Sequence, residues 1–200
     1  MKTNILKTLL KLTFILVYGI SYSQVEINGY VKSSITGVKP ISEIYVELLN
    51  SKKPLLERMT IADSLGFFRI KNLKPYKLYE VQLSVFGYDN QIFEIKTNDG
   101  ITKTTLIIEA HCEYNKEQAD EDWNNNRAKL LLVGSIAPRA NSLSDTRFEK
   151  KYGIEYFDFG CTPPTEECIK IYNERIFEIM DEKYGKIWRK KVRSDVEYLN

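Results

Sequence analysis

Between residues 24 and 110, apolar side chains recur in short runs separated by turn residues. Residues 43–50 alternate, with Ile44, Val46 and Leu48 on one face and polar or amphipathic side chains between them. A period of two places one face of a strand in a core and the other in water. Runs of the same kind occupy residues 25–31, 56–62, 67–70, 78–85, 91–96 and 102–109. Seven short strands at regular spacing, with no helical pattern between them, predict an antiparallel β-sandwich.

After residue 110 the pattern becomes one of helices and short buried strands. The expected elements are a helix over 115–127, a strand over 129–134, a helix over 145–152, a strand over 154–159 and a helix over 165–184. Ser144 and Thr165 suit helix N-caps, and Gly153 and Gly185 suit helix ends. Strand, helix and strand within about 30 residues form the βαβ pattern, which predicts two parallel strands covered by helices.

The helix over 165–184 has one broad apolar face, which we expect to cover the small sheet. This face consists of Cys168, Ile169, Tyr172, Ile176, Phe177, Ile179, Met180 and Tyr184. Apolar residues continue at helical spacing through Trp188, Val192, Val196 and Leu199. A second helix is therefore expected to run to the C-terminus.

The first 23 residues have the pattern of an export signal. They contain lysines and no acid, and they include an apolar run over 12–20. Ser21 and Ser23 form a small-x-small pattern directly before Gln24. The alternative is an uncleaved membrane anchor, but the run is short for a span of about 20 residues. We therefore predict cleavage near Ser23–Gln24 and a periplasmic or secreted protein.

Charge and composition exclude two classes of protein. Cleavage would remove three of the 29 basic residues and none of the 27 acidic ones, leaving a mature net charge of −1. Binding to nucleic acid is not expected at that charge. Hydrophobic residues make up 43% and charged residues 28% of the chain, which argues against disorder.

Motifs of fixed spacing run through residues 24–110. They are Ile27-x-Gly29-x-Val31, Gly37-x-x-Pro40-Ile41, Ile44-x-Val46, Thr60-x-x-Asp63-x-x-Gly66-x-Phe68-x-Ile70, Leu73 and Phe86-Gly87-Tyr88. In order and spacing they resemble the carboxypeptidase regulatory-like family. The resemblance implies a seven-stranded transthyretin-like sandwich that acts as a scaffold without catalysis. The sequence departs from the family at Ser42-Glu43, where the family often has an alanine after its Pro-Leu pair.

The central motif also has a direct physical interpretation. Asp63 suits a turn cap, and Gly66 suits a position with positive φ. Phe68 would then enter the core.

Residues 148–161, with Glu167-Cys168 and residues 184–189, resemble an uncharacterised tail of exported bacterial proteins. That resemblance implies no activity. We divide the chain into a signal peptide over 1–23, a carboxypeptidase regulatory-like β-sandwich over 24–110 and a small mixed α/β domain over 111–200 that ends in two helices.

The chain has three cysteines, Cys112, Cys161 and Cys168. In an oxidising compartment two of them are expected to form a disulfide. Cys161 and Cys168 are the favoured pair because they are close in sequence across a turn that leads into a helix. A bond from Cys112 to either of them is the alternative.

Ligands of open α/β sheets gather where the carboxyl ends of strands meet. This rule predicts a binding site that includes Ser135, Arg139 and Asp158. Arg139 would bind a carboxylate or phosphate, and Asp158 would accept a hydrogen bond. The alternative is that Arg139 and Asp158 form an ion pair that fixes the loop.

Catalytic chemistry has weaker support in the sequence. His111 is the single histidine, and a thiol enzyme would pair it with Cys161. No Cys-x₂₋₄-Cys motif is present, so we expect no metal site and no cofactor. The tripeptide Asp158-Phe159-Gly160 matches a kinase motif by chance, because the other kinase motifs are missing.

The C-terminal stretch is basic, and it predicts contact with an anionic membrane surface or an acidic partner. The residues concerned are Lys186, Arg189, Lys190 and Arg193. A solvated basic face is the alternative.

Together these patterns predict an exported, non-enzymatic envelope protein. The sandwich would be a scaffold, and the tail would bind an envelope protein or a small ligand. The alternative is a small extracytoplasmic hydrolase or thiol enzyme that uses Cys161 with His111.

Overall fold

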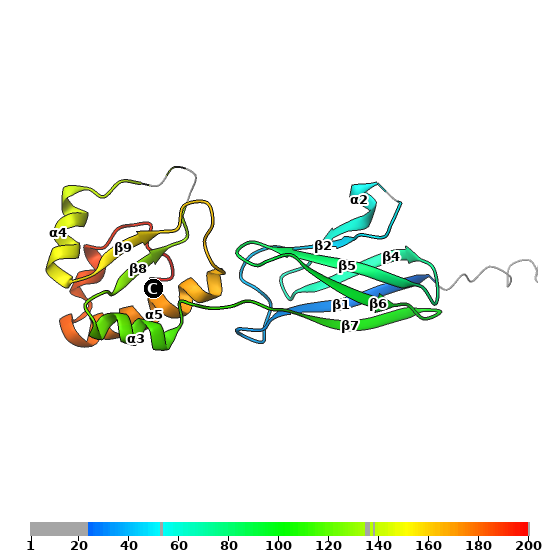
Figure 1. Ribbon diagram of the computed structural model, residues 1–200, viewed down its shortest axis with the longest axis horizontal. Coiled ribbons are helices and arrows are strands. Elements are labelled where there is room, and N and C mark those ends of the chain that lie inside the picture. The colour runs from blue at the N-terminus through cyan, green and yellow to red at the C-terminus, as the bar shows by residue number, and fades with distance from the viewer. Residues whose placement is uncertain (1–23, 53, 135–136, 138, 200) are drawn as a thin grey trace, which may run out of the picture.

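The computed structural model describes residues 24–52, 54–134, 137 and 139–199. The predicted signal peptide lies outside the described residues. Figure 1 shows two parts joined end to end, one built from strands and one from helices around a small sheet. Each part has its own cluster of buried apolar side chains. We call them the sandwich part and the C-terminal part.

The sandwich part contains two sheets. One has the strand order β4-β1-β7 and the other has the order β3-β2-β5-β6. The elements are β1 (Val25–Ser33), β2 (Ile44–Leu48), α2 (Leu55–Arg58), β3 (Met59–Ile61), β4 (Phe67–Leu73), β5 (Leu78–Val85), β6 (Gln91–Lys96) and β7 (Ile101–Ile108). Apolar side chains from both sheets form a single core between them. The alternation predicted for β2 and β5 is confirmed, since their inward positions are buried and the intervening ones are not.

Two details of the sandwich differ from the prediction. β1 pairs with β7 in parallel, so the sandwich is not wholly antiparallel. Residues 56–62 were expected to form one strand, but α2 occupies the first half and only β3 pairs with β2. The Glu57 amide donates to the Pro54 carbonyl and starts a helical turn there. Leu56 points to solvent with 88% of its surface exposed, so apolar character alone did not indicate a sheet position.

The turn before β4 forms as its residues predict. Asp63 Oδ1 accepts hydrogen bonds from the amides of Leu65 at 2.8 Å and Phe67 at 2.9 Å. Gly66 has a φ of 79°, which a residue with a side chain adopts only with strain. Phe68 follows and lies in the core, 1% exposed.

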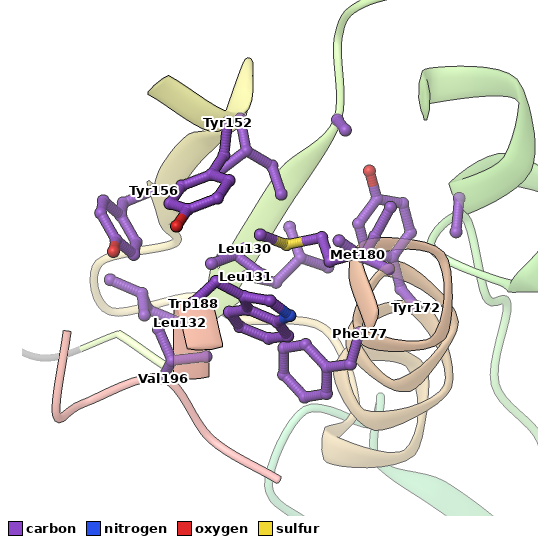
Figure 2. Close-up of a cluster of buried hydrophobic side chains, with 14 of the residues drawn as sticks. Leu130, Leu131, Leu132, Tyr152, Tyr156, Tyr172, Phe177, Met180, Trp188 and Val196 are labelled. Atoms are coloured by element: carbon purple, nitrogen blue, oxygen red, sulfur yellow. The ribbon is translucent and has the colours of Figure 1, made fainter. Parts of the chain in front are cut away.

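The C-terminal part consists of a two-stranded parallel sheet and helices around it. Its elements are α3 (Lys116–Asn124), β8 (Lys129–Leu132), α4 (Leu143–Tyr152), β9 (Glu155–Asp158), α5 (Glu166–Tyr184) and the 3₁₀ helix η1 (Lys186–Lys190). The parallel pairing of β8 with β9 confirms the βαβ prediction. In Figure 2, Leu130 and Leu131 of β8 meet Phe177 and Met180 of α5 and the indole of Trp188. Leu130 and Leu131 are both fully buried, which shows that β8 is covered on both faces.

Two helix ends differ from the prediction. Helix α4 is capped by Ser142 instead of Ser144, because Asp145 lies three residues after Ser142 and completes a capping box with it. The expected C-terminal helix ends with η1 at Lys190. Beyond it, residues 191–199 form turns, and Val196 packs into the core from this irregular segment.

Candidate functional site

The predicted ligand site at the carboxyl ends of β8 and β9 is only partly described, because Ser135 lies outside the described residues. The Asp158 carboxylate accepts a hydrogen bond from the Gly160 amide at 2.7 Å and so closes its own turn. A side chain at Gly134 would clash with the Gly160 carbonyl oxygen, so the two loops meet backbone to backbone. The ligand site itself stays a prediction.

Arg139 contacts a different carboxylate from the one expected. Its guanidinium lies 3.4 Å from Asp145 Oδ2 and 3.5 Å from the Ser194 hydroxyl. No hydrogen bond or ion pair joins Arg139 to Asp158, so the predicted ion pair is wrong. Asp145 takes that role because the capping box already fixes its carboxylate at the start of α4.

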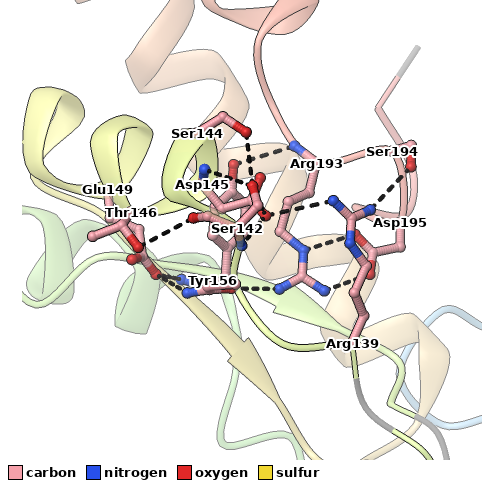
Figure 3. Close-up of polar contacts among 11 residues, drawn as sticks. Arg139, Ser142, Ser144, Asp145, Thr146, Glu149, Tyr156, Arg193, Ser194 and Asp195 are labelled. Carbon is pink, nitrogen blue, oxygen red and sulfur yellow. Dashed lines mark hydrogen bonds and ion pairs between the residues drawn. The ribbon is translucent and has the colours of Figure 1, made fainter.

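Arg139 belongs to a polar cluster around the buried guanidinium of Arg193, shown in Figure 3. Arg193 is 4% exposed. It donates to both Asp195 oxygens, at 2.9 and 2.6 Å, and to Asn141 Oδ1 at 2.6 Å. Its guanidinium also lies 5.2 Å from the ring centroid of Tyr156. These contacts fasten the C-terminal segment to the loop before α4.

The charges of this cluster stabilise the ionised form of its acids. The Arg193 hydrogen bonds lower the pKa of Asp195. Burial raises the pKa of Asp145, but hydrogen bonds from Ser142 and the charges of Arg139 and Arg193 outweigh burial, and the pKa is lowered. The cluster is therefore a set of matched charges that holds the chain together.

This cluster also corrects the predicted basic surface. Arg193 is buried, and Arg189 donates to both oxygens of Asp181, at 3.1 and 2.9 Å. Lys186 and Lys190 remain exposed. Of the four residues that were expected to face a membrane, Arg193 is therefore buried and Arg189 is half-buried in an ion pair.

The disulfide joins Cys112 to Cys168, and Cys161 is free and exposed. The predicted Cys161–Cys168 bond is wrong, and the alternative that included Cys112 is confirmed. Cys168 lies in the first turn of α5 and is fully buried, whereas Cys161 lies in the exposed turn after β9. Closeness in sequence did not decide the pairing, because the two side chains lie in different environments. No hydrogen bond joins Cys161 to His111.

The same first turn of α5 connects the two parts of the molecule. Glu167 Oε1 accepts a hydrogen bond from the Ile41 amide at 2.8 Å, and Glu166 Oε1 accepts one from the Ser42 hydroxyl at 2.6 Å. Gly87 has a φ of 78°, and a Cβ there would lie 2.7 Å from the Pro164 carbonyl oxygen. We call these contacts, with the adjacent disulfide, the junction. In the sequence, Glu167 stands out only as part of the tail motif, and no pattern indicates a contact of Glu166 or Glu167 with the sandwich part.

A polar groove of about 650 Å³ lies at the amino ends of β8 and β9, at the opposite edge of the sheet from the predicted site. Its floor is the buried carboxylate of Asp122 in α3. This carboxylate accepts hydrogen bonds from the Tyr172 hydroxyl at 2.9 Å and Gln118 Nε2 at 3.0 Å, and Arg127 lies 3.6 Å away. We call this feature the amino-edge groove.

Three charged side chains of the groove are not neutralised. Among the described residues, no hydrogen bond or ion pair engages the side chains of Lys129, Glu113 or Glu155. Lys129 is half-buried, and its ammonium lies 4.3 Å from the ring centroid of Phe157 and 5.9 Å from that of Tyr114. Burial, with the charges of Glu113 and Asp122, raises the pKa of Tyr114. The groove thus presents one ammonium and two carboxylates around an aromatic ring.

Sequence reasoning missed this groove, although a signal was present. Lys129 and Glu155 begin the two strands, and the parallel register pairs them directly. Charged residues at the first positions of two paired parallel strands must lie side by side at one edge.

The described part of the chain contains no group of three or more His, Cys, Asp or Glu side chains placed to hold a metal ion. No helix in it has the length and apolar character needed to cross a membrane.

Comparison with known proteins gives similarities of low degree. No family model matches the chain, and no curated protein matches it. A type II cohesin–X-dockerin complex from Acetivibrio cellulolyticus aligns over 58% of this chain and 80% of its own, with 16% identity and a TM-score of 0.35. A dioxygenase domain from Streptomyces sp. SirexAA-E covers 47% of this chain and 84% of its own, with 8% identity and a TM-score of 0.35. Chlorocatechol 1,2-dioxygenase from Pseudomonas putida covers 46% and 63%, with 15% identity and a TM-score of 0.30. Similarities of this degree assign no function.

Proposed function

We propose that this chain is an exported, non-catalytic binding protein of the cell envelope. In this proposal the sandwich part is a rigid support, and the amino-edge groove binds a small ligand. The observation that carries the proposal is a set of charged side chains in the groove that have no ion-pair partner among the described residues: Lys129, Glu113 and Glu155.

The groove chemistry indicates the class of ligand. Lys129 would bind a carboxylate, and Glu113 and Glu155 would bind a positively charged group. Tyr114 lies between them and offers apolar contact to the body of the ligand. A ligand with both charges, such as an amino acid or a short peptide, matches this arrangement. The volume of about 650 Å³ is in the range of small-molecule sites.

The support role rests on the junction and on the resemblance to the carboxypeptidase regulatory-like family. We assign the sandwich to the transthyretin-like arrangement of seven strands, with the turn at Asp63, Gly66 and Phe68 as the main support. Glu166, Glu167 and the disulfide at the start of α5 would hold the groove in a fixed orientation on that support.

The proposed location outside the cytoplasm rests on the N-terminal pattern and on the disulfide. A Cys112–Cys168 bond persists in oxidising compartments and is rare in reducing ones. Cleavage near Ser23–Gln24 is part of the same proposal.

A thermal-shift screen of the exported protein with single amino acids and dipeptides tests the function. Ligands that stabilise the chain would then be titrated by calorimetry into the Lys129→Met and Glu155→Gln variants. We expect binding to weaken at least about tenfold in each, since each loses one charged contact. Lys150→Met is the control, because Lys150 is exposed on α4 away from the groove. If no probe binds, or if binding is equal in all variants, the proposal is wrong.

The thiol-enzyme alternative retains one favourable observation, which is that Cys161 is free and exposed. Timed alkylation of the exported protein at pH 6 distinguishes the two functions. The binding proposal predicts slow alkylation of Cys161, because an ordinary cysteine is present mainly as the unreactive thiol in weak acid. Fast alkylation that His111→Ala slows would favour the enzyme.

A further inference from the structure

The outer face of the three-stranded sheet, β4-β1-β7, is strongly basic. Strand residues alternate between the core and this face, and four basic side chains point outward and are exposed: Lys32, Arg69, Lys71 and Lys103. The three strands contain one acidic residue, Glu26, which is 8% exposed and lies 3.8 Å from Arg69. We call this surface the basic face.

The other sheet has the opposite charge. Its four strands contain three acids, Glu47, Glu80 and Glu94, at positions between buried apolar residues, and one base, Lys96. Glu47 pairs with Arg58 at 3.1 Å. The charges of the sandwich are therefore separated across its core, although the net charge of the whole chain is close to zero.

The basic face also carries aromatic surface in a fixed position. Tyr30 of β1 lies opposite Phe67 of β4, with ring centroids 5.4 Å apart. Tyr30 is 45% exposed. The Arg69 guanidinium lies 5.7 Å from the Phe67 centroid and donates from Nε to Asn28 Oδ1 at 3.2 Å. These contacts fix the ring and the cation next to each other on the outer face of the sheet.

Strand register sets the spacing of the charges. Asn28 of β1 is the partner of Arg69 on one side and of Lys103 on the other. Strands are about 4.8 Å apart, so the backbone positions of Arg69 and Lys103 lie about 10 Å apart across the sheet. The result is an open sheet face with an exposed ring and several cations.

We propose that the basic face binds an extended acidic polysaccharide. The carboxylates of the polymer would pair with Arg69, Lys103 and Lys32, and a sugar ring would stack on Tyr30. Charge complementarity carries the choice of an anionic partner. An open sheet face with charges spread over three strands favours an extended chain that lies along it, whereas insertion into a bilayer buries an apolar helix face about 5–10 Å deep.

The test is binding of the exported protein to polygalacturonate, measured by biolayer interferometry at 0.15 M salt. We expect Arg69→Glu with Lys103→Glu to weaken binding at least about tenfold, and Tyr30→Ala to weaken it severalfold. The matched control is Lys52→Glu with Lys96→Glu, which changes the net charge equally at exposed positions outside the basic face. It should bind like the wild type. Circular dichroism confirms that each variant is folded.

Three results would overturn the proposal. The first is no binding of the wild-type protein to polygalacturonate. The second is an equal loss in the control variant, which would show a response to net charge alone. The third is binding to phosphatidylglycerol vesicles without binding to polygalacturonate, which would identify an anionic membrane as the partner.

Discussion

The two parts of this protein bury different kinds of side chain. The sandwich core is built from aliphatic residues and a few rings, and the single buried charged residue among those described in the sandwich part is Glu26, on the outer face of β1. The C-terminal part buries several charged or strongly polar side chains together with its aromatic core: Asp122, Asp145, Glu167, Asn173 and Arg193. The apolar cluster of the C-terminal part is as extensive as that of the sandwich and richer in aromatic rings, so its hydrogen bonds, ion pairs and disulfide add to a core of comparable size. The comparison teaches that the sandwich is stabilised mainly by apolar burial, whereas the C-terminal part combines apolar burial with specific polar contacts.

The largest expected effect comes from the two cores. Trp188→Ala should lower the unfolding free energy of the C-terminal part by about 3–5 kcal/mol, because a fully buried indole is replaced by a cavity. Phe68→Ala should do the same to the sandwich part. Both tryptophans, Trp123 and Trp188, lie in the C-terminal part, so Trp123 fluorescence during urea unfolding of Trp188→Ala reports on that part alone. A global far-UV signal supplies the other transition. If each variant shifts both transitions equally, the two parts unfold as one unit and the comparison fails.

The next largest loss of stability is expected from removing the disulfide. Cys112 lies in the segment that leads into the C-terminal part, and Cys168 lies in α5 of that part. Replacing Cys112 and Cys168 with serine should destabilise that part by about 2–4 kcal/mol, since the bond closes a loop with a sequence separation of 56. The measurement is urea unfolding followed by tryptophan fluorescence. Cys161→Ser is the matched control, and it should unfold like the wild type because Cys161 is exposed and unbonded.

A substitution at the junction should lower the unfolding free energy by a smaller amount. Gly87→Ala forces a side chain against the Pro164 carbonyl oxygen and into a left-handed backbone region, at about 1–3 kcal/mol. We expect the two parts to separate at the junction, which small-angle scattering would detect as a larger radius of gyration. Gly37→Ala is the control, because Gly37 also has a positive φ but has open space around it. Equal expansion in both variants would contradict a specific contact at Gly87.

The smallest expected effect is on the pH dependence of the stability of the C-terminal part. The pKa of Asp145 and that of Asp195 are lowered in the folded state, so both groups add stability above the unfolded pKa of about 3.9, and this stability is lost as the pH falls through the folded values. Asp145→Asn should lower the stability of the C-terminal part by about 1 kcal/mol at pH 7. The difference from the wild type should shrink below pH 4. A difference that stays constant from pH 7 to pH 3 would show that the charge of Asp145 contributes nothing.

The alternating pattern predicted most of the sandwich because the period of two is a local property. β5 and β6 begin and end at the residues that the pattern indicated. The parallel pairing of β1 with β7 was not predictable in this way, since it joins residues far apart in sequence. The helix at Leu55 and Leu56 was missed for a related reason, because those leucines face solvent and have no core to match.

The site was less predictable than the fold. The sequence identified Arg139 as a cation near polar residues, but its partner Asp145 depends on a capping box in a helix whose start was displaced by two residues. The cysteine pairing depends on which way the first turn of α5 faces, and periodicity does not settle that at a helix end. The starts of the two predicted strands would have indicated this pair, because Lys129 is the first residue of one predicted strand and Glu155 is the second residue of the other.

The position of β1 in its sheet has a consequence for folding during synthesis. β1 is the first described strand to be synthesised, yet it lies at the centre of its sheet, between β4 and β7. β4 can pair with one edge of β1 once Leu73 has emerged, but the other edge stays open until β7, which ends at Ile108. Open strand edges invite pairing with other chains. β1, the first described strand to be synthesised, is thus among the last to be paired on both edges. We expect a nascent chain of this protein to need protection from aggregation at β1 until β7 has been synthesised.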